Sequence, residues 1–122
     1  MVRKYQKTDY KEVESWFHKR NIPITEDYLP EHGFIAPGIA AGYLYATDAN
    51  FCLFECFISD PSVPKSECHK ALREIVTCLI QEAKELGFKD AFGFATSKTM
   101  IEIGYEQDFK FVEKCTTIQR VL

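Results

Sequence analysis

The sequence predicts a single α/β domain, built as one mixed sheet with helices on both faces. Three β-type runs between residues 33 and 59 are separated only by short turns, which is typical of an antiparallel meander. A long helical repeat of apolar residues follows, and then a strand, a helix and a strand. The predicted order is β-α-(α)-β-β-β-α-β-α-β, in which right-handed β–α–β crossovers follow the meander.

The composition limits the classes of function. The chain has 122 residues, of which 46% are hydrophobic and 27% charged, as in an ordinary soluble domain with one core. A net charge of −3 gives no reason to expect nucleic acid or an anionic membrane as a partner. The sequence has neither an apolar run of the ~18 residues that span a bilayer nor a signal peptide. We therefore expect a cytoplasmic protein.

The cysteine pattern supports a reducing compartment and argues against a metal site. The chain has five cysteines, an odd number, and no CxxC pair. Their positions are Cys52, Cys56, Cys68, Cys78 and Cys115. Cysteines spaced in this way are typical of small buried residues in a reduced protein. The three histidines are scattered along the chain, whereas a zinc site needs closely spaced ligands.

The N-terminal third predicts a strand, a helix and a loop. A short strand at residues 2–6 precedes a helix at residues 9–20, capped by Thr8 or Asp9, with three large apolar residues on one face. Two prolines bracket residues 21–30, which predicts an exposed loop with one helical turn at residues 25–28.

The meander consists of strands at residues 33–37, 39–47 and 51–59, with turns at Pro37-Gly38 and at residues 47–50. The third strand, "FCLFECFIS", is apolar on both faces except for Glu55, which indicates a central strand covered on both sides.

The C-terminal half predicts two more helices and two more strands. Ser66 is the expected N-cap of the long amphipathic helix, and Gly87 is its expected left-handed C-cap. A strand at residues 89–96, a helix at residues 97–107 and a closing strand at residues 110–122 complete the chain.

Three stretches resemble the GNAT acetyltransferase superfamily, over nearly the whole chain. They are "GFIAPGIAAGYLYAT", "KALREIVTCLIQEAKELGFKDAFGF" and "SKTMIEIGYEQDFKFVEK". The resemblance implies acetyl-coenzyme A as cofactor. Its pantetheine arm would lie in a gap between "FECFISD" and "AFGFAT", facing the backbone of Phe57, Ile58 and Ser59. Its pyrophosphate would rest on the loop before the long helix, where unpaired N–H groups favour an anion. The residues of that loop are Lys65, Ser66, Glu67, Cys68, His69 and Lys70.

The loop departs from the family pattern, because Glu67 and His69 stand where glycines are common. Glycine lets the backbone approach the phosphates closely. Lys65, Ser66 and Lys70 could compensate in part, as two cations and a hydroxyl donor. The sequence leaves open whether this loop still binds the cofactor.

Glu55 is the candidate general base, and its alternative is a wet or lysine-paired residue at the sheet surface. The resemblance points to Tyr105 as the candidate acid, although the tyrosine is one residue out of register and could simply pack on the helix surface. Ser97 stands where the family often contacts the cofactor, but the simpler interpretation, which we prefer, is an N-cap. Cys68 beside His69 would suit a nucleophile, but no orienting Asn or Asp is identifiable.

The family reads its acceptor in the loop that here contains Glu26, Asp27 and Tyr28, which would favour a cationic amine unless they form only a solvated turn. Two functions follow. The first is an acetyl-CoA-dependent N-acyltransferase that acts on a primary amine, of a small molecule or a protein, by direct attack. The second is a catalytically inactive GNAT-fold binding or assembly module, because compact chains with degenerate loops also resemble phage-encoded accessory or virion proteins. A homodimer is compatible with either.

Overall fold

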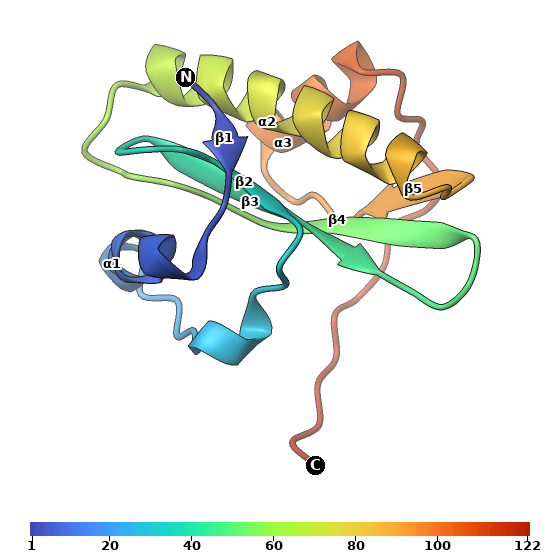
Figure 1. Cartoon of the computed structure of the whole chain (residues 1–122), viewed down its shortest axis with the longest axis horizontal. Helices are drawn as coiled ribbons and strands as arrows, with labels where there is room; N and C mark the ends of the chain where they lie inside the picture. Colours follow the sequence, from blue (N-terminus) through green and yellow to red (C-terminus); the bar gives the residue numbers. More distant parts are fainter.

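A computed structural model describes residues 1–122 and shows one five-stranded sheet with helices on both faces (Figure 1). Where η marks a 3-10 helix, the elements in chain order are β1 (Arg3–Lys4), η1 (Lys7–Asp9), α1 (Tyr10–Lys19), η2 (Glu26–Tyr28), β2 (Gly33–Ala36), β3 (Ala40–Ala46), β4 (Phe51–Ser59), α2 (Lys65–Glu85), β5 (Asp90–Gly93) and α3 (Lys98–Glu106). None of the helices combines the length and the apolar character that a membrane span requires.

The strands lie side by side in the order in which the chain forms them. The first four are antiparallel to their neighbours, and β5 is parallel to β4 after the crossover through α2. The predicted meander, the mixed sheet and the single α/β layer structure are therefore confirmed.

Each face of the sheet has its own core. On one face α2 and α3 bury side chains of β3 and β4, among them Leu44 and Phe54. On the other face α1 packs Trp16 and Phe17 against the sheet, where Tyr43 is fully buried. Alternation along β3 sends successive side chains to opposite cores. Burial on both faces explains why β3 and β4 are apolar along nearly their whole length.

Three of the four helix-end predictions are confirmed, the first of them Asp9 as the N-cap of α1. Gly87 follows α2 with φ +88°, the left-handed conformation that glycine adopts without steric cost. Ser97 caps α3, because its Oγ accepts the N–H of Met100 at 3.2 Å. The prediction for Ser66 is wrong: α2 begins at Lys65, and its N-cap is Pro64, two residues before the predicted one and without a polar side chain. Proline fits this place because its fixed φ suits the entry to a helix.

The predicted closing strand at residues 110–122 is also wrong for the single chain. These residues form no regular element, and none of the backbone hydrogen bonds involves them. The second β–α–β crossover is therefore absent. Asp108, at φ +67°, turns the chain sharply after α3, and the four-residue β5 offers only a short edge for pairing.

Candidate functional site

The main feature of the candidate site is a fork between β4 and β5. The two strands pair over four positions, from Phe51 opposite Asp90 to Phe54 opposite Gly93. Beyond that point β4 continues to Ser59, paired only with β3, while β5 has ended. The separation of strands that the resemblance implied is thus present, and it opens toward the N-terminal end of α2.

Glu55 lies at the apex of this fork. Its Oε1 accepts the backbone N–H of Phe94 at 2.8 Å, directly after the last paired position of β5. The side chain is half-buried and pairs with no lysine, so the lysine-paired form of the surface alternative is not present. Burial raises the pKa of the Glu55 carboxyl, and the backbone N–H groups of Phe94 and Cys56 oppose this shift. A raised pKa makes the carboxylate a better acceptor for the proton of an ammonium group.

A β-bulge follows Glu55 immediately. Between two pairs that link β3 and β4, Ala41 with Ile58 and Tyr43 with Glu55, β4 has one more residue than β3. Cys56 lies in this bulge with φ +57°, a left-handed conformation that is uncommon for a residue with a side chain. An outlier of this kind at the apex of an open fork is typical of functional sites. The sequence analysis missed it, because nothing in the residue type signals it.

The bulge also connects the fork to the predicted acceptor loop. The hydroxyl of Tyr45 donates to the backbone C=O of Tyr28 at 2.7 Å and lies 3.0 Å from the Sγ of Cys56. This chain of contacts holds η2, with Glu26 and Asp27, over the sheet face that carries Glu55. Burial raises the pKa of the Cys56 thiol, so that it stays protonated.

One of the three backbone contacts predicted along β4, that of Ile58, is at odds with the pairing of the strands. Asp60 donates its N–H to Ile39 on the β3 side at 2.8 Å, and backbone groups alternate in direction along an antiparallel strand. Ser59 therefore turns its backbone toward the fork, whereas Ile58 turns toward β3 and buries its side chain under α1. Phe57 lies in the bulge, beside the fork.

Two cations that the sequence analysis missed reach this edge from the end of α1. Arg20 donates from Nε to the backbone C=O of Ser59 at 3.0 Å, and from Nη2 to its Oγ at 2.9 Å. Lys19 lies 3.2 Å from Oδ1 of Asp60. No sequence signal pointed to them, because basic residues in the last turn of a helix are explained by the helix dipole alone.

The loop before α2 is held by its own hydrogen bonds. Asp60 Oδ1 accepts the N–H and the hydroxyl of Ser62, and these bonds hold the pKa of the Asp60 carboxyl below its usual value. The thiol of Cys68 is buried and points to the backbone C=O groups of Asp60 and Val63. This contact gives Cys68 a structural role and argues against a Cys–His nucleophile.

The first turn of α2 leaves two backbone donors free. Glu67 and Cys68 donate their N–H groups to Pro64, whereas those of Lys65 and Ser66 have no partner. Pro64 supplies no side-chain cap for them. Free N–H groups at an uncapped helix N-terminus attract anions.

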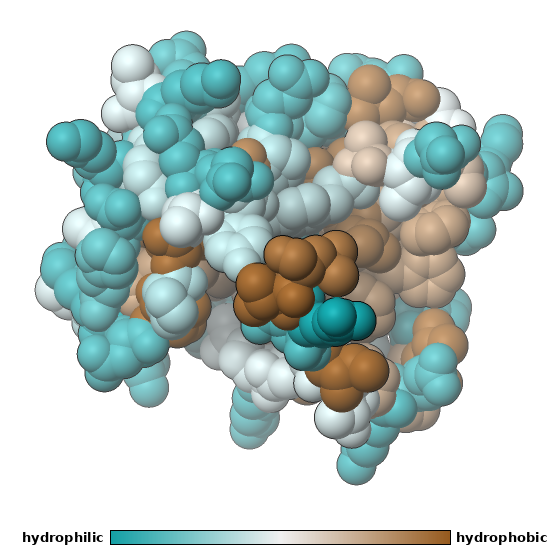
Figure 2. Space-filling model, turned by 90° about the horizontal axis from the view of Figure 1, so that it is seen from below, coloured by the Kyte–Doolittle hydropathy of each residue, from teal (hydrophilic) through white to brown (hydrophobic).

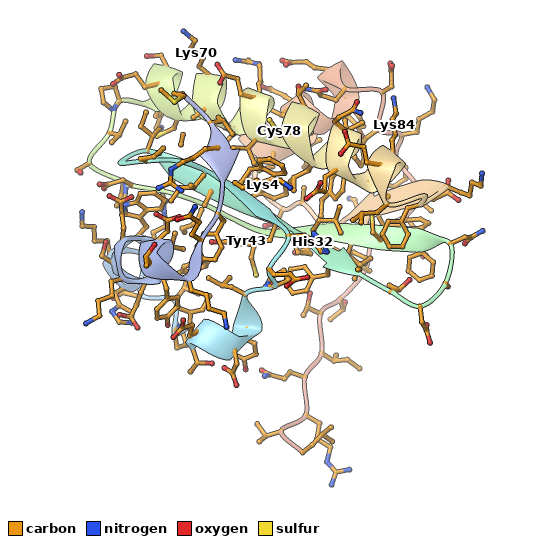
Figure 3. All side chains as sticks on the ribbon, viewed as in Figure 1. Lys4, His32, Tyr43, Lys70, Cys78 and Lys84 are labelled. Carbon is orange, nitrogen blue, oxygen red and sulfur yellow. The ribbon has the colours of Figure 1, made fainter.

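The predicted phosphate loop, residues 65–70, is not a loop in the structure but the first turns of α2. The side chain of Glu67 is exposed and forms no hydrogen bond, so it does not block the turn. His69 faces α3, with Nε2 3.1 Å from Oγ1 of Thr99. Lys70 points away from the sheet on the outer side of α2 (Figure 3).

No hydrogen bond connects Tyr105 with Glu55. Tyr105 is 54% exposed on α3, and it lies two residues, about 200° around the helix, from the buried Ile103. Ser97 uses its hydroxyl for the cap of α3. A separate surface hollow of about 310 Å³ lies away from the fork and is lined by Val2, Arg73, Glu74, Thr77 and Cys78.

Comparison with solved structures finds the same fold in proteins of low sequence identity. TTHA1254 from Thermus thermophilus is 12% identical over 99% of this chain and 97% of its own, with a TM-score of 0.72. Rv2747 from Mycobacterium tuberculosis, solved in complex with CoA, is 16% identical over 93% of this chain and 73% of its own, with a TM-score of 0.75. An aminoglycoside acetyltransferase from an uncultured soil sample, solved with sisomicin, is 11% identical over 100% of this chain and 95% of its own, with a TM-score of 0.64.

No protein-family model matches the sequence, and no curated protein sequence matches it. The likeness therefore lies in the arrangement of strands and helices, which the solved acetyltransferases share from end to end with this chain. This protein has the GNAT fold.

Proposed function

We propose that this protein is an acetyl-CoA-dependent N-acyltransferase that acetylates a primary amine, of a small molecule or a protein, by direct attack. The observation that carries the proposal is the fork between β4 and β5 with Glu55 at its apex. A fold alone does not imply function. The fork adds a site in which a half-buried carboxylate of raised pKa adjoins an open strand edge, and the free donors lie at the start of α2, the next helix along the chain.

The residues around the fork fit the cofactor at both of its ends. The β4 edge at Phe57 and the N–H of Ser59 offer backbone groups to an amide-containing arm, while the C=O of Ser59 is bound by Arg20. The free N–H groups of Lys65 and Ser66, with the Lys65 ammonium, would meet the pyrophosphate. Bound acetyl-CoA would supply an acetyl group activated as a thioester.

Glu55 is the proposed base. It would take the proton of the attacking amine, directly or through a water molecule, while the bond to Phe94 fixes its orientation. Tyr105 is the proposed acid, which would return a proton to the leaving sulfur. Its side chain is 54% exposed, and its hydroxyl is not engaged in any side-chain hydrogen bond, so it is available as a proton donor.

The acceptor loop favours a cationic amine. Glu26 and Asp27 are exposed in η2, and the contact from Tyr45 to Tyr28 holds this loop over the Glu55 face. Two carboxylates near the entry of the site would concentrate cations there.

Thermal unfolding with coenzyme A tests the proposal. Ligand at 100 times its dissociation constant adds about 2.7 kcal/mol of stability. Pantetheine and ADP, tested separately, probe the strand fork and the α2 donors. A shift with coenzyme A, together with release of thiol from acetyl-CoA in the presence of polyamines or aminoglycosides, is the expected result. No shift at millimolar coenzyme A would exclude the acyltransferase.

A second function, a binding module without catalysis, is favoured by one observation. No residue between 60 and 70 has a positive φ, so the loop does not form the glycine type of phosphate cradle. A protein that binds coenzyme A but releases no thiol with any amine would match this second function.

A further inference from the structure

The contact between Arg20 and Ser59 lies on the open edge of β4. Ser59 is opposite Ala40 on β3, and this pair is of the non-hydrogen-bonded kind, because Asp60 donates its N–H to Ile39. The N–H and C=O of Ser59 therefore point away from β3, to the side on which β5 has already ended. Nε of Arg20 donates to this C=O at 3.0 Å. Arg20 thus occupies an acceptor that the pantetheine arm of the proposed cofactor would use.

The guanidinium of Arg20 crosses this edge from one face of the sheet to the other. Helix α1 lies on one face, where Trp16 is buried. The side chain of Ser59 belongs to the other face, because Ala40 opposite it packs in the core under α2. Nη2 of Arg20 nevertheless lies 2.9 Å from the Oγ of Ser59. The side chain therefore lies across the edge, in the place that a neighbouring strand or a ligand would take.

The positive charge of Arg20 has no anionic partner. None of the ion pairs includes it, and both of its acceptors are neutral oxygens of Ser59. Lys19, the preceding residue, is by contrast paired with Asp60 at 3.2 Å. A phosphate would add the attraction of opposite charges to the hydrogen bonds, and it matches the planar fork of a guanidinium. A phosphate is therefore a better partner for Arg20 than Ser59 is.

The start of α2 lies beside this contact. The backbone C=O of Asp60, the residue after Ser59, is 3.9 Å from Sγ of Cys68 in the first turn of α2. The same turn presents the free N–H groups of Lys65 and Ser66. Arg20 and these donors therefore flank the same end of the fork.

Only the side chain of Arg20 is free to move. Its backbone closes α1, where its N–H donates to Phe17 at 3.0 Å, and Asn21 follows in the left-handed conformation at φ +57°. The side chain is exposed, and the surface on the α1 side of the molecule is mostly hydrophilic (Figure 2). A move of Arg20 from Ser59 to a ligand needs only the rotation of this side chain.

We propose that Arg20 is a further cofactor-binding residue, which leaves Ser59 for the pyrophosphate of coenzyme A and so frees the β4 edge for the pantetheine arm. This inference rests on the proposed function. An arm without phosphate must compete with Arg20 for the C=O of Ser59, whereas an arm with pyrophosphate draws Arg20 away and is held by it. Arg20 thus makes the site selective for carriers with a pyrophosphate over phosphate-free pantetheine thioesters.

Isothermal titration of Arg20→Met with two ligands tests the proposal by opposite signs. Methionine keeps an unbranched apolar stem and removes every donor. Coenzyme A should bind about tenfold more weakly, because hydrogen bonds to a charged group are lost. Pantetheine should bind severalfold more tightly, because the C=O of Ser59 is free. Arg20→Lys keeps the charge without the planar fork and should give a coenzyme A affinity between those of the parent and Arg20→Met.

Two controls separate this effect from general changes of charge. Lys11→Met removes a positive charge from the exposed face of α1 and should alter neither affinity. Dephospho-coenzyme A lacks the 3′-phosphate and keeps the pyrophosphate, so Arg20→Met should bind it about tenfold more weakly than the parent does, as with coenzyme A. Absence of this loss would show that Arg20 does not bind the pyrophosphate and would overturn the proposal.

NMR of the arginine Nε–H groups follows the contact without a change of sequence. The Arg20 signal should be protected from solvent exchange in the free protein and should shift when coenzyme A saturates it. An unchanged signal, or affinities for coenzyme A and pantetheine that change in the same direction or not at all in Arg20→Met, would overturn this inference alone. Failure of the parent to bind coenzyme A would overturn the proposed function with it.

Discussion

The carboxylate of Glu55 accepts the backbone N–H of Phe94 at 2.8 Å, one position beyond the last pair of β4 and β5. A side chain thus replaces the next backbone bond of the ladder at the point where the two strands separate. Burial raises the pKa of the same carboxyl. One residue therefore both ends the pairing of the strands and provides the proton acceptor of the candidate site.

Glu55→Gln should reduce the turnover number about 100-fold, because an amide cannot accept the proton of the amine. Glutamine can still accept the N–H of Phe94, so the fork should keep its shape. The parental rate should fall as the pH drops below the raised pKa of Glu55, and the variant should lack this limb of the pH profile. Steady-state kinetics of thiol release measure both effects. Glu74→Gln, on the exposed face of α2, is the control, and equal rates in the parent and Glu55→Gln would show that another group is the base.

Lys65 permits a separate test of the backbone donors at α2. Lys65→Gln removes the charge and keeps the N–H, whereas Lys65→Pro removes both. Proline fits the first position of a helix, and Pro64 before it is already extended at ψ 139°. Isothermal titration with coenzyme A should show a further loss of roughly tenfold or more from the glutamine to the proline variant, because a hydrogen bond to a charged group is lost.

Glu67→Gln should act in the opposite direction. It removes a negative charge from the first turn of α2 and should strengthen coenzyme A binding severalfold, since two like charges a few ångströms apart in water repel by about 1 kcal/mol. Equal affinity in the parent and in all three variants of Lys65 and Glu67 would place the phosphates elsewhere.

Gly42 and Gly104 should respond to alanine with opposite signs. A Cβ at Gly42 would lie 2.5 Å from the ring of Phe57 and 2.9 Å from Ile75, so Gly42→Ala should lower the free energy of unfolding by about 1–3 kcal/mol. A Cβ at Gly104 meets nothing nearer than 3.6 Å, and alanine favours a helix interior by about 1 kcal/mol. Urea denaturation compares the two variants with the parent. A stable Gly42→Ala would mean that Phe57 is not packed in the bulge as described.

Asp9 links the first strand to α1. It accepts both Nη groups of Arg3, at 2.9 and 2.8 Å, and the N–H of Gln6 at 2.8 Å. The hydrogen bond from Arg3 holds the pKa of Asp9 below its ordinary value of 3.8. Its stabilisation is therefore complete above pH 3.8 and is lost as the pH falls through the lower folded value.

Asp9→Asn should consequently lower the free energy of unfolding by about 1 kcal/mol at pH 7, and the difference should vanish in acid. Thermal melts of both proteins from pH 7 to pH 2.5 measure this. A difference that persists unchanged at the lowest pH would assign the effect to something other than the charge of Asp9.

The fold was predictable where local pattern and burial agree. The meander and the helix that ends at Gly87 follow from periodicity and from the one residue type that accepts φ +88° without cost. The start of α2 was less predictable, because Ser66 and Pro64 both favour a helix N-terminus and only the packed structure decides between them.

The candidate site was predictable only in part. Glu55 stands out in the sequence as the single charge in an apolar strand, but its partner is a backbone N–H, which no residue pattern announces. The same holds for Arg20, which binds a backbone C=O, and for Cys56, whose left-handed conformation is imposed by the bulge. Residues 110–122 do not form the predicted strand, because a strand needs a second segment to pair with, and the residue pattern of one segment does not show whether that partner is in place.

The order of the strands has a consequence for how this molecule assembles. The strands β2, β3 and β4 are joined by short turns, so their contacts close short loops, whereas β1 pairs with β2 only across α1, and β5 can dock only after a 21-residue helix has crossed the sheet. Because longer closures cost more entropy, we expect β2 to β4 to form the early nucleus and β5 to join late. The cleft that would receive the ligand would then be the last part of the molecule to mature, and β5 amides should open more readily than those of β3 in native-state labelling.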